Sequence, residues 1–448
     1  QSYFFTNNKR EPLPSPPKIR RVNALVSGNY SFKNRYFVDA TLRVDGSTQF
    51  GSANRYATFW SLGLGWNIHN EAFMKERWKG LRILRLRANS GLTGNQNFGS
   101  FASTVSYLPI GDDIAGGIIH ESLGNPQLEW QNTRQTNIGL DVELWKGRVS
   151  FTANLFEKLT SPLIADIDLP PSTGVSNYAL NVGDLRLRGY EGMLRFSPIY
   201  QPSGDWFCTI GLTALGYSSK FQNLSSLLNG ANEQLRDAKA LSRFQNGYSP
   251  DDLWAVRSLG IDPATGREVF LTKEGQPSFD YDDNDVVKVG NQRPWVEGVL
   301  SSLVGFKGFQ LGAYFRYRLG VTRLNEALYE KVENITFDEL SSNQDRRALY
   351  DRWQQPGDQA RFKGISLLDE TPISSRFLQR ENIFSGESLS IAYLWEAGKS
   401  LWLKRIGIRS IRITGYANDF FRISNILAER GTAYPFSRTY ALSFGLTL

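Results

Sequence analysis

Apolar and polar residues alternate with a period of two along much of this chain. Residues 38–45 sort into an apolar set and a polar set: Val38, Ala40, Leu42 and Val44 against Asp39, Thr41, Arg43 and Asp45. The segments 149–155, 310–318 and 440–448 sort in the same way. A strand points successive side chains to opposite faces, whereas a helix would scatter both sets around its axis. The pattern predicts an all-β chain with roughly a dozen to fourteen antiparallel strands.

The length of the alternating segments indicates where the strands lie. The segments run to about ten residues, whereas strands of globular proteins are usually nearer five or six. A tilted strand needs roughly nine to eleven residues to cross the hydrocarbon layer. The polar sets also hold arginine and aspartate, which suit a water-filled lumen better than the dry core of a β-sandwich. We therefore predict a transmembrane β-barrel whose apolar side chains face lipid.

Hydropathy does not separate a barrel from a soluble sandwich. The mean hydropathy is −0.35. A transmembrane helix would need a run of about 18 apolar residues, and the chain has none. In a barrel only every second strand residue faces lipid, so the average stays low, as it does in a sandwich.

The connections between the segments fall into two classes. Lys146-Gly147 and Phe306-Lys307-Gly308 predict tight turns, whereas residues 219–252 and 321–384 are long, polar and irregular. Residues 325–331 and 345–353 have helical spacing inside the second long segment. Bacterial barrels combine short periplasmic turns with long external loops, so we predict extracellular loops near 219–252 and 321–384.

Composition and charge exclude other classes. The net charge of +7 is spread along 448 residues without a basic block, which argues against nucleic-acid binding. One cysteine, Cys208, allows no internal disulfide, and its apolar neighbours predict a small buried side chain. No linker divides the chain, so residues 1–448 are expected to form one structural unit.

Several strings resemble the C-terminal part of SusC/RagA-like, TonB-dependent outer-membrane transporters. They share their order and spacing with that family and lie at residues 43–50, 55–66, 84–96, 125–141, 260–266, 352–358 and 434–435. Two examples are the string Arg-Val-Asp-Gly-Ser-Thr-Gln-Phe at 43–50 and the string Leu-Thr-Gly-Asn-Gln at 92–96. Each string alone is a weak signal, but together they cover nearly the whole chain.

The resemblance implies a fold and a set of partners. The fold would be a barrel of about 22 strands, of which this chain supplies roughly the last dozen. The N-terminal plug and the segment that contacts TonB would lie outside this chain. A SusD-like surface lipoprotein would cover the barrel, and the location would be the outer membrane of a Gram-negative bacterium. No cofactor is implied.

A dozen strands cannot form a closed barrel of this size by themselves. Both edges of such a sheet would expose unpaired N–H and C=O groups to hydrocarbon, at a cost of several kcal/mol each. We therefore expect the remaining strands and the plug to come from upstream sequence or from another chain.

Two groups of residues are candidates for ligand binding. The first consists of charged residues on the polar strand faces: Asp39, Arg43, Asp45, Arg85, Arg87, Arg316 and Arg318. They could touch a solute, although every wide barrel needs a polar lining, so a wall of charge pairs is the simpler interpretation. The second group consists of loop aromatics, which could stack on a sugar ring or pack within their loops: Tyr248, Trp254, Trp353 and Phe362.

Catalytic and metal motifs are weak. His69 and His120 lie far apart without partners at zinc-ligand spacing. Residues 280–285 resemble the start of a calcium loop, but Asp285 stands at the glycine position and no closing glutamate follows, which favours a solvated loop. No nucleophile elbow or phosphate loop occurs, so we expect no enzyme.

Three functions fit these observations to different degrees. The first is active import of an oligosaccharide or a peptide through the outer membrane. The second is a barrel of the same family that acts as a structural or assembly platform. The third is a soluble β-rich carbohydrate-binding protein or hydrolase, which strand length and lumen charge disfavour.

Overall fold

A computed structural model describes most of the chain. The described residues are 3–5, 12–14, 20–48, 55–95, 105–112, 115–169, 171–175, 177–200, 206–341, 343–366, 369–396, 398, 402, 405, 407–427 and 437–448. Five residues of the strings that resemble the transporter family lie outside them: Gln49, Phe50, Gln96, Tyr434 and Pro435.

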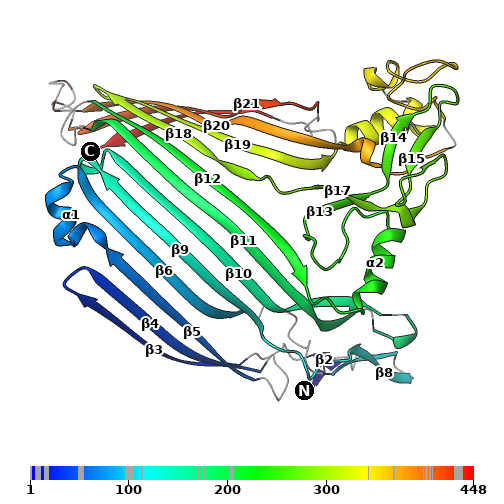
Figure 1. The fold of residues 1–448 in the computed structure, drawn as a ribbon, viewed down its shortest axis with the longest axis horizontal. Coiled ribbons are helices and arrows are strands. Elements are labelled where there is room, and N and C mark those ends of the chain that lie inside the picture. The colour runs from blue at the N-terminus through cyan, green and yellow to red at the C-terminus, as the bar shows by residue number, and fades with distance from the viewer. Residues whose placement is uncertain are drawn as a thin grey trace.

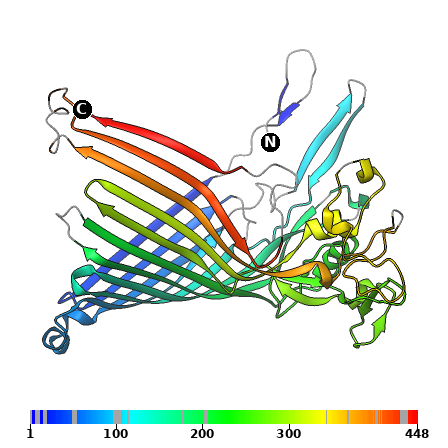
Figure 2. The same ribbon diagram turned by 90° about the horizontal axis from the view of Figure 1, so that it is seen from above.

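Long antiparallel strands form one curved sheet (Figure 1). Within the described residues it has 13 strands: β3 Arg21–Phe32, β4 Tyr36–Ser47, β5 Tyr56–Asn67, β6 Leu81–Asn95, β9 Gln131–Leu144, β10 Val149–Asp168, β11 Asn177–Tyr200, β12 Trp206–Gln222, β18 Val296–Phe306, β19 Phe309–Leu324, β20 Leu378–Glu396, β21 Ser410–Ser424 and β22 Thr439–Thr447. Figure 2 shows this sheet bent into an open trough. The predicted strand number and antiparallel all-β class are confirmed.

The strands are longer than the sequence predicted. They range from nine residues in β22 to 24 in β11. The alternation reveals only the part of each strand with an apolar face, while several strands continue beyond it with polar residues on both faces. The longest strands therefore extend past the thickness of a hydrocarbon layer.

Smaller elements lie between the wall strands. The short strands are β1 Tyr3–Phe5, β2 Pro12–Pro14, β7 Ser106–Asp112, β8 Ala115–Ser122, β13 Asp252–Ala255, β14 Arg257–Ile261, β15 Glu268–Leu271, β16 Pro277–Ser278 and β17 Val287–Asn291. The helices are α1 Ala72–Arg77, α2 Leu228–Asp237 and the π-helix η5 Ala327–Glu333. Single 3-10 turns are η1 Ile68–Asn70, η2 Trp145–Gly147, η3 Pro171–Thr173, η4 Asp283–Asp285, η6 Asp338–Ser341, η7 Arg346–Ala348 and η8 Ser375–Phe377. Within the described residues, no helix is both long and apolar enough to cross a membrane.

The two ends of the sheet differ in their connections (Figure 1). At one end, residues 33–35 join β3 to β4, residues 145–148 join β9 to β10, and Lys307-Gly308 joins β18 to β19 with positive φ at both residues. At the other end, residues 223–295 and 325–377 form two long excursions. The first is much longer than the predicted loop at 219–252, because its short strands β13–β17 also carry alternating residues.

The apolar strand residues point away from the trough. Four residues chosen from the sequence as lipid-facing are each 38–51% exposed: Phe151, Val38, Leu311 and Leu42. They continue across neighbouring strands, because Leu42 pairs with Val26 and Trp60, and Trp60 pairs with Leu92. No other part of the described chain covers this face. It is therefore the apolar belt of a membrane barrel.

Aromatic residues border the apolar belt at both ends. At the short-turn end, Trp206 lies 5.3 Å from Phe306, and Phe309 lies 4.5 Å from Tyr393, measured between ring centroids. At the loop end, the hydroxyl of Tyr190 donates a 2.9 Å hydrogen bond to the carbonyl of Trp295. Such aromatic rims mark the two membrane–water interfaces of a barrel.

Candidate functional site

Ion pairs line the polar face of the sheet. Arg87 donates two hydrogen bonds to Asp141, at 2.8 and 3.1 Å, and a third to Asn154 on the next strand at 3.1 Å. Asn154 in turn donates to Glu191 at 2.9 Å. The network therefore crosses four strands, β6, β9, β10 and β11, and stiffens the wall.

The other charged candidates in the first half of the sheet also have partners. Arg43 pairs with Asp45 at 2.9 Å and lies over the ring of Phe59 at 5.4 Å. Arg85 donates a 2.8 Å hydrogen bond to Asn67. These contacts favour the wall interpretation for Arg43, Asp45 and Arg85.

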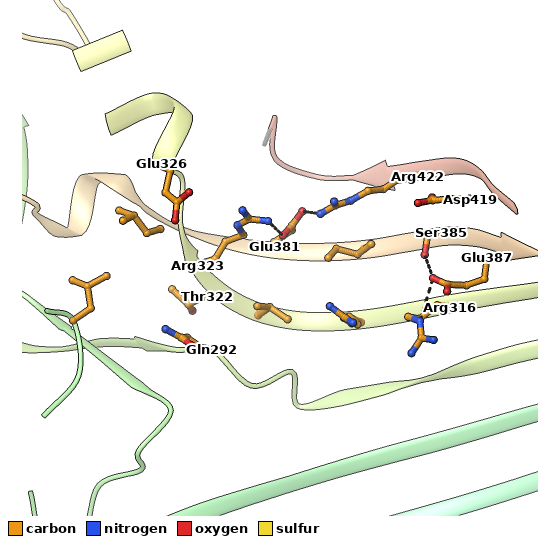
Figure 3. A pocket seen from close by; sticks show the side chains of 15 residues that line it. Gln292, Arg316, Thr322, Arg323, Glu326, Glu381, Ser385, Glu387, Asp419 and Arg422 are labelled. Atoms are coloured by element: carbon orange, nitrogen blue, oxygen red, sulfur yellow. Dashed lines mark hydrogen bonds and ion pairs between the residues drawn. The ribbon is translucent and has the colours of Figure 1, made fainter. Parts of the chain in front are cut away.

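A cleft of about 820 Å³ lies on the polar face at the loop end of β19, β20 and β21 (Figure 3). Two loop residues, Leu241 and Gln292, reach into its lining from the first excursion. Of the charged candidates, the structure brings Arg316 and Arg318 together in this cleft. Arg43, Asp45, Arg85 and Arg87 belong to β4 and β6 and do not line it.

Glu387 organises one end of the cleft. Its carboxylate accepts a hydrogen bond from Ser385 at 3.0 Å and pairs with Arg316 at 3.1 Å. Glu387 sits at a bulge, where Gly386 pairs with Phe315 and Ser388 pairs with Tyr314. The extra residue breaks the strict alternation and turns Glu387 toward the lumen beside Ser385.

Glu381 organises the other end of the cleft. Its side chain is 1% exposed, and one carboxylate oxygen accepts hydrogen bonds from Arg422 and Ser424, both at 2.8 Å. The other oxygen has Arg323 at 3.5 Å and no hydrogen bond. That oxygen is buried beside Arg323 and retains acceptor capacity.

The cleft carries both signs of charge, and none of its described lining residues is aromatic. Its charged lining residues are four arginines and four carboxylates: Arg316, Arg318, Arg323, Arg422, Glu326, Glu381, Glu387 and Asp419. Guanidinium and carboxylate groups together can accept and donate hydrogen bonds to a polar solute. The surface is therefore suited to contact with hydrated polar molecules.

The loop aromatics pack within the two excursions. Trp254 is 7% exposed and lies 4.8 Å from the ring of Tyr248. Trp353 donates a 2.9 Å hydrogen bond to the carbonyl of Pro263, and Phe362 is 7% exposed. These contacts favour loop packing over ligand stacking for Trp254, Trp353 and Phe362.

A buried ionic cluster joins the two excursions. Arg376 donates hydrogen bonds to Glu268 in the first excursion at 2.8 Å and to Glu333 in the second at 2.7 Å. Burial alone would lower the pKa of Arg376, but these hydrogen bonds raise it above its ordinary value. The arginine therefore stays charged between two carboxylates. Sequence reasoning missed this cluster, as it missed Glu381 and Glu387, because no short motif links residues more than 40 positions apart.

The acidic segment 280–285 does not converge on one point. Asp280 pairs with Arg267 at 3.4 Å, Asp282 accepts from the backbone of Asn284, and Asp285 accepts from the backbone of Lys273. Among the described residues, no three His, Cys, Asp or Glu side chains gather as a metal site would require.

The remaining candidates have local surroundings. His69 lies beside the backbone of Leu84, and His120 lies 4.8 Å from the ring of Tyr107. Cys208 is half-buried and unpaired in β12, on the lipid-facing side of the strand, so the prediction of a buried cysteine was only partly right.

Comparison with known proteins agrees with this architecture. The family described as TonB dependent receptor-like, beta-barrel, matches residues 3–319, which is well over half of the chain. The chain belongs to this family.

Curated TonB-dependent receptors and a solved structure are similar to the chain. The TonB-dependent receptor SusC of Bacteroides thetaiotaomicron is 33% identical over 329 residues, which cover 68% of this chain and 31% of SusC. The TonB-dependent receptor P39 of Formosa agariphila is 24% identical over 90% of this chain and 43% of its own length. The structure of the RagAB peptide transporter matches with a TM-score of 0.80 and 22% identity, over 91% of this chain and 44% of that chain.

These comparisons define how much of a TonB-dependent receptor this chain represents. It spans less than half the length of the relatives and of the solved structure that it matches. The structural match extends across the open sheet and its loops, so the trough in Figure 2 has the fold of part of an outer-membrane receptor barrel. The predicted resemblance to SusC/RagA-like transporters is confirmed.

Proposed function

We propose that this chain is the C-terminal part of an outer-membrane nutrient importer of the SusC type. The observation that carries the proposal is the polar cleft on the lumen side of a sheet whose opposite face is an exposed apolar belt. A lipid-facing barrel with a solvated, charged passage is built to move polar molecules across a membrane. Membership of the TonB-dependent receptor family supports the same conclusion.

Other strands complete the barrel in this proposal. Every neighbouring pair from β3 to β22 is antiparallel, so these two edge strands run in the same direction. Direct pairing of the two edges would be parallel, which barrels of this kind do not use. Closure with antiparallel neighbours therefore requires an odd number of additional strands. A barrel of about 22 strands would need about nine, which satisfies that condition.

The partners follow from the same assignment. The two excursions form a packed surface at one end of the sheet, where a SusD-like surface lipoprotein would cover the entrance. The part of its fold that this chain shares with the RagAB peptide transporter supports this assignment. Energy would come from the TonB complex, through the N-terminal part of the receptor, and the location would be the outer membrane of a Gram-negative bacterium.

The substrate in this proposal is an oligosaccharide or a peptide. Both are too large for simple diffusion pores and both present hydrogen-bonding groups that the charged cleft can meet. Arg316 and Arg318 are the ligand-binding candidates that the cleft supports. Arg43, Asp45, Arg85, Arg87, Trp254 and Trp353 remain weaker candidates because wall or loop contacts occupy them.

The second candidate function is a structural or assembly platform in an outer-membrane complex. The ionic cluster that fixes the two excursions to each other favours it, because a rigid external surface suits protein docking. A platform would need the surface but not an open cleft.

Two matched variants of the complete receptor distinguish import from the platform. Ile383→Trp would narrow the cleft by placing a bulky side chain in it, whereas Phe384→Trp places the same side chain on the lipid-facing side of the strand. In a strain that lacks the receptor gene, we expect Phe384→Trp to restore growth on the transported nutrient and Ile383→Trp to fail at equal outer-membrane abundance. Equal growth with both variants on every glycan and peptide tested would contradict import.

A further inference from the structure

Four basic side chains gather on the lipid-facing side of the wall, at its loop end. Strand pairing aligns Arg134 of β9 with Leu159 of β10, Leu159 with Arg186 of β11, and Arg186 with Lys220 of β12. Two residues closer to the apolar belt on the same strands, Glu157 of β10 pairs with Arg188 of β11. We call the set of Arg134, Arg186, Arg188 and Lys220 the outward basic patch.

The alternation of each strand places this patch outside the barrel. Arg188 and Arg186 lie two and four residues beyond Tyr190, a member of the aromatic rim, with no register shift between them. Side chains two residues apart point to the same face, so both arginines share the outward direction of Tyr190. Arg134, Arg188 and Lys220 are exposed, as that direction requires.

The height of the patch matches the headgroup layer. At about 3.3 Å per residue, Arg188 lies roughly 7 Å and Arg186 roughly 13 Å beyond Tyr190 along the strand. Strand tilt of about 45° reduces these heights to roughly 5 and 9 Å. A bilayer of about 40–45 Å with a hydrocarbon core of about 30 Å leaves roughly 5–8 Å on each side for headgroups. Arg188 therefore lies within the polar layer directly above the apolar belt, and Arg186 lies at the outer limit of that layer.

The patch has an excess of positive charge. Glu157 pairs with Arg186 at 2.9 Å and also with Arg188, so one carboxylate serves two guanidinium groups. Within the described residues, Arg134 and Lys220 form no ion pair, and the Nε atom of Arg186 is buried without a hydrogen bond. The patch thus leaves about three positive charges uncompensated on a surface that faces lipid.

A recess beside the patch offers room for a compact anion. A cavity of about 400 Å³ is lined by Ser218, Lys220, Trp295 and Arg380, and also by Asp251 and Asp252. Those two aspartates already pair with Arg293 at 3.2 Å and Lys288 at 2.7 Å. Lys220 and Arg380 remain free, within the described residues, to meet a negative group from the membrane side.

We propose that the outward basic patch binds the phosphate groups of a phosphorylated glycolipid in the outer leaflet of the membrane. Two arginines with fixed spacing can contact phosphate oxygens in bidentate fashion, and Arg134 and Lys220 flank them as point charges. The acyl chains of the same lipid would lie along the apolar belt below Tyr190. The ligand is therefore a lipid of this bilayer and not the transported solute.

The experiment compares two double variants of the complete receptor in detergent. Arg134→Gln with Lys220→Gln removes two charges of the patch that have no ion-pair partner, so folding is preserved. Lys158→Gln with Arg195→Gln removes two charges from β10 and β11 on the lumen side, and serves as the matched control. Binding of bis-phosphorylated lipid A is measured by native mass spectrometry and by the rise in unfolding temperature on lipid addition.

We expect the patch variant to bind lipid A about tenfold more weakly than the wild type and the lumen control to bind it like the wild type. Dephosphorylated lipid A should bind the wild type as weakly as intact lipid A binds the patch variant. Equal binding by both double variants would overturn the proposal. So would equal binding of dephosphorylated lipid, or full competition by millimolar inorganic phosphate, which would indicate a site for free anions.

Discussion

The wall and the loop cluster of this receptor chain use charged residues in opposite ways. In the wall, Arg87 and Asp141 form their ion pair with side chains 38% and 24% exposed. In the cluster formed by residues 223–295 and 325–377, Arg376 pairs with Glu333 while their side chains are 13% and 0% exposed. The wall charges face water in the lumen, whereas the cluster charges lie in a packed interior.

The difference follows from what holds each region together. The wall is stabilised by backbone hydrogen bonds between strands and by lipid against its apolar belt, so its polar side chains are free to remain hydrated. The loop cluster has a dry core of its own, with Leu253, Val256, Val332 and Phe377 at 2% exposure or less. A charge in such a core must be paired, because an uncompensated buried charge is costly.

The largest expected effect is on the buried ion pair of the loop cluster. Arg376→Ala leaves Glu268 and Glu333 without their shared partner, and breaking a buried pair costs about 3–5 kcal/mol. We expect hydrogen exchange in residues 223–295 and 325–377 to accelerate strongly, while exchange in the wall strands stays unchanged. Arg346→Ala is the control, because it removes an exposed arginine from residues 325–377 that is not part of the ionic cluster. Unchanged exchange in both variants would show that the ionic cluster does not join the excursions.

The next effect tests the two faces of the wall with one substitution. Leu300→Arg puts a charge on the lipid-facing side of β18, at a cost of about 2–4 kcal/mol near the bilayer midplane. Ser301→Arg puts the same charge on the lumen side, where it faces Gly211 and water, and should cost little. Urea unfolding of the complete receptor in lipid vesicles measures both. Similar losses for the two variants would mean that the faces are assigned incorrectly.

A smaller effect is expected for the wall ion pairs. Half-exposed pairs contribute about 0–1 kcal/mol, so Arg87→Ala should change the unfolding free energy by no more than that. The difference between Arg87→Ala and Arg376→Ala tests the comparison of the wall with the loop cluster directly. Arg87 makes two hydrogen bonds to one carboxylate, and Arg376 is shared by two carboxylates. A loss above about 2 kcal/mol would place Arg87 with the buried pairs.

The smallest expected effect is on how the stability of the short-turn end changes when the pH is lowered. Glu71, between η1 and α1, accepts hydrogen bonds from Tyr36 at 2.8 Å and Trp66 at 3.1 Å, and these hold its pKa below the ordinary value. A lowered pKa in the folded state stabilises the fold above the ordinary carboxyl pKa, and this contribution is lost as pH falls through the lowered pKa. We expect the wild type to lose slightly more stability on acidification than Glu71→Gln. Parallel pH profiles of the unfolding temperature would contradict this.

The sequence predicted the wall better than the cleft. Strand number, direction and facing could be predicted because each strand carries its own alternation, as in Leu311 against Arg316. Arg316 and Arg318 were identified as lumen residues, but their partners Glu387 and Glu297 were not. Glu387 faces the lumen because of a bulge, and a bulge changes the alternation in a way that the period-two pattern does not reveal.

Trp254 and Trp353 show a second limit. As aromatics in polar loops they were candidates for stacking on a ligand, yet Trp254 packs against Tyr248 in its own excursion and Trp353 donates a hydrogen bond to Pro263 in the other excursion. Whether a loop aromatic meets solvent or a neighbouring loop depends on how the excursions fold over each other. No local pattern carries that information.

By itself, the sequence determined the curved wall and its two faces, because a strand's facing follows from residues i and i+2 and requires no knowledge of distant parts of the chain. Tertiary structure decided everything that depends on residues meeting across the fold. This includes the cleft between β19, β20 and β21, the ionic cluster that joins the two excursions, and the outward basic patch. Strand register brings the charges of the cleft and the basic patch together, and the packing of one excursion on the other forms the ionic cluster.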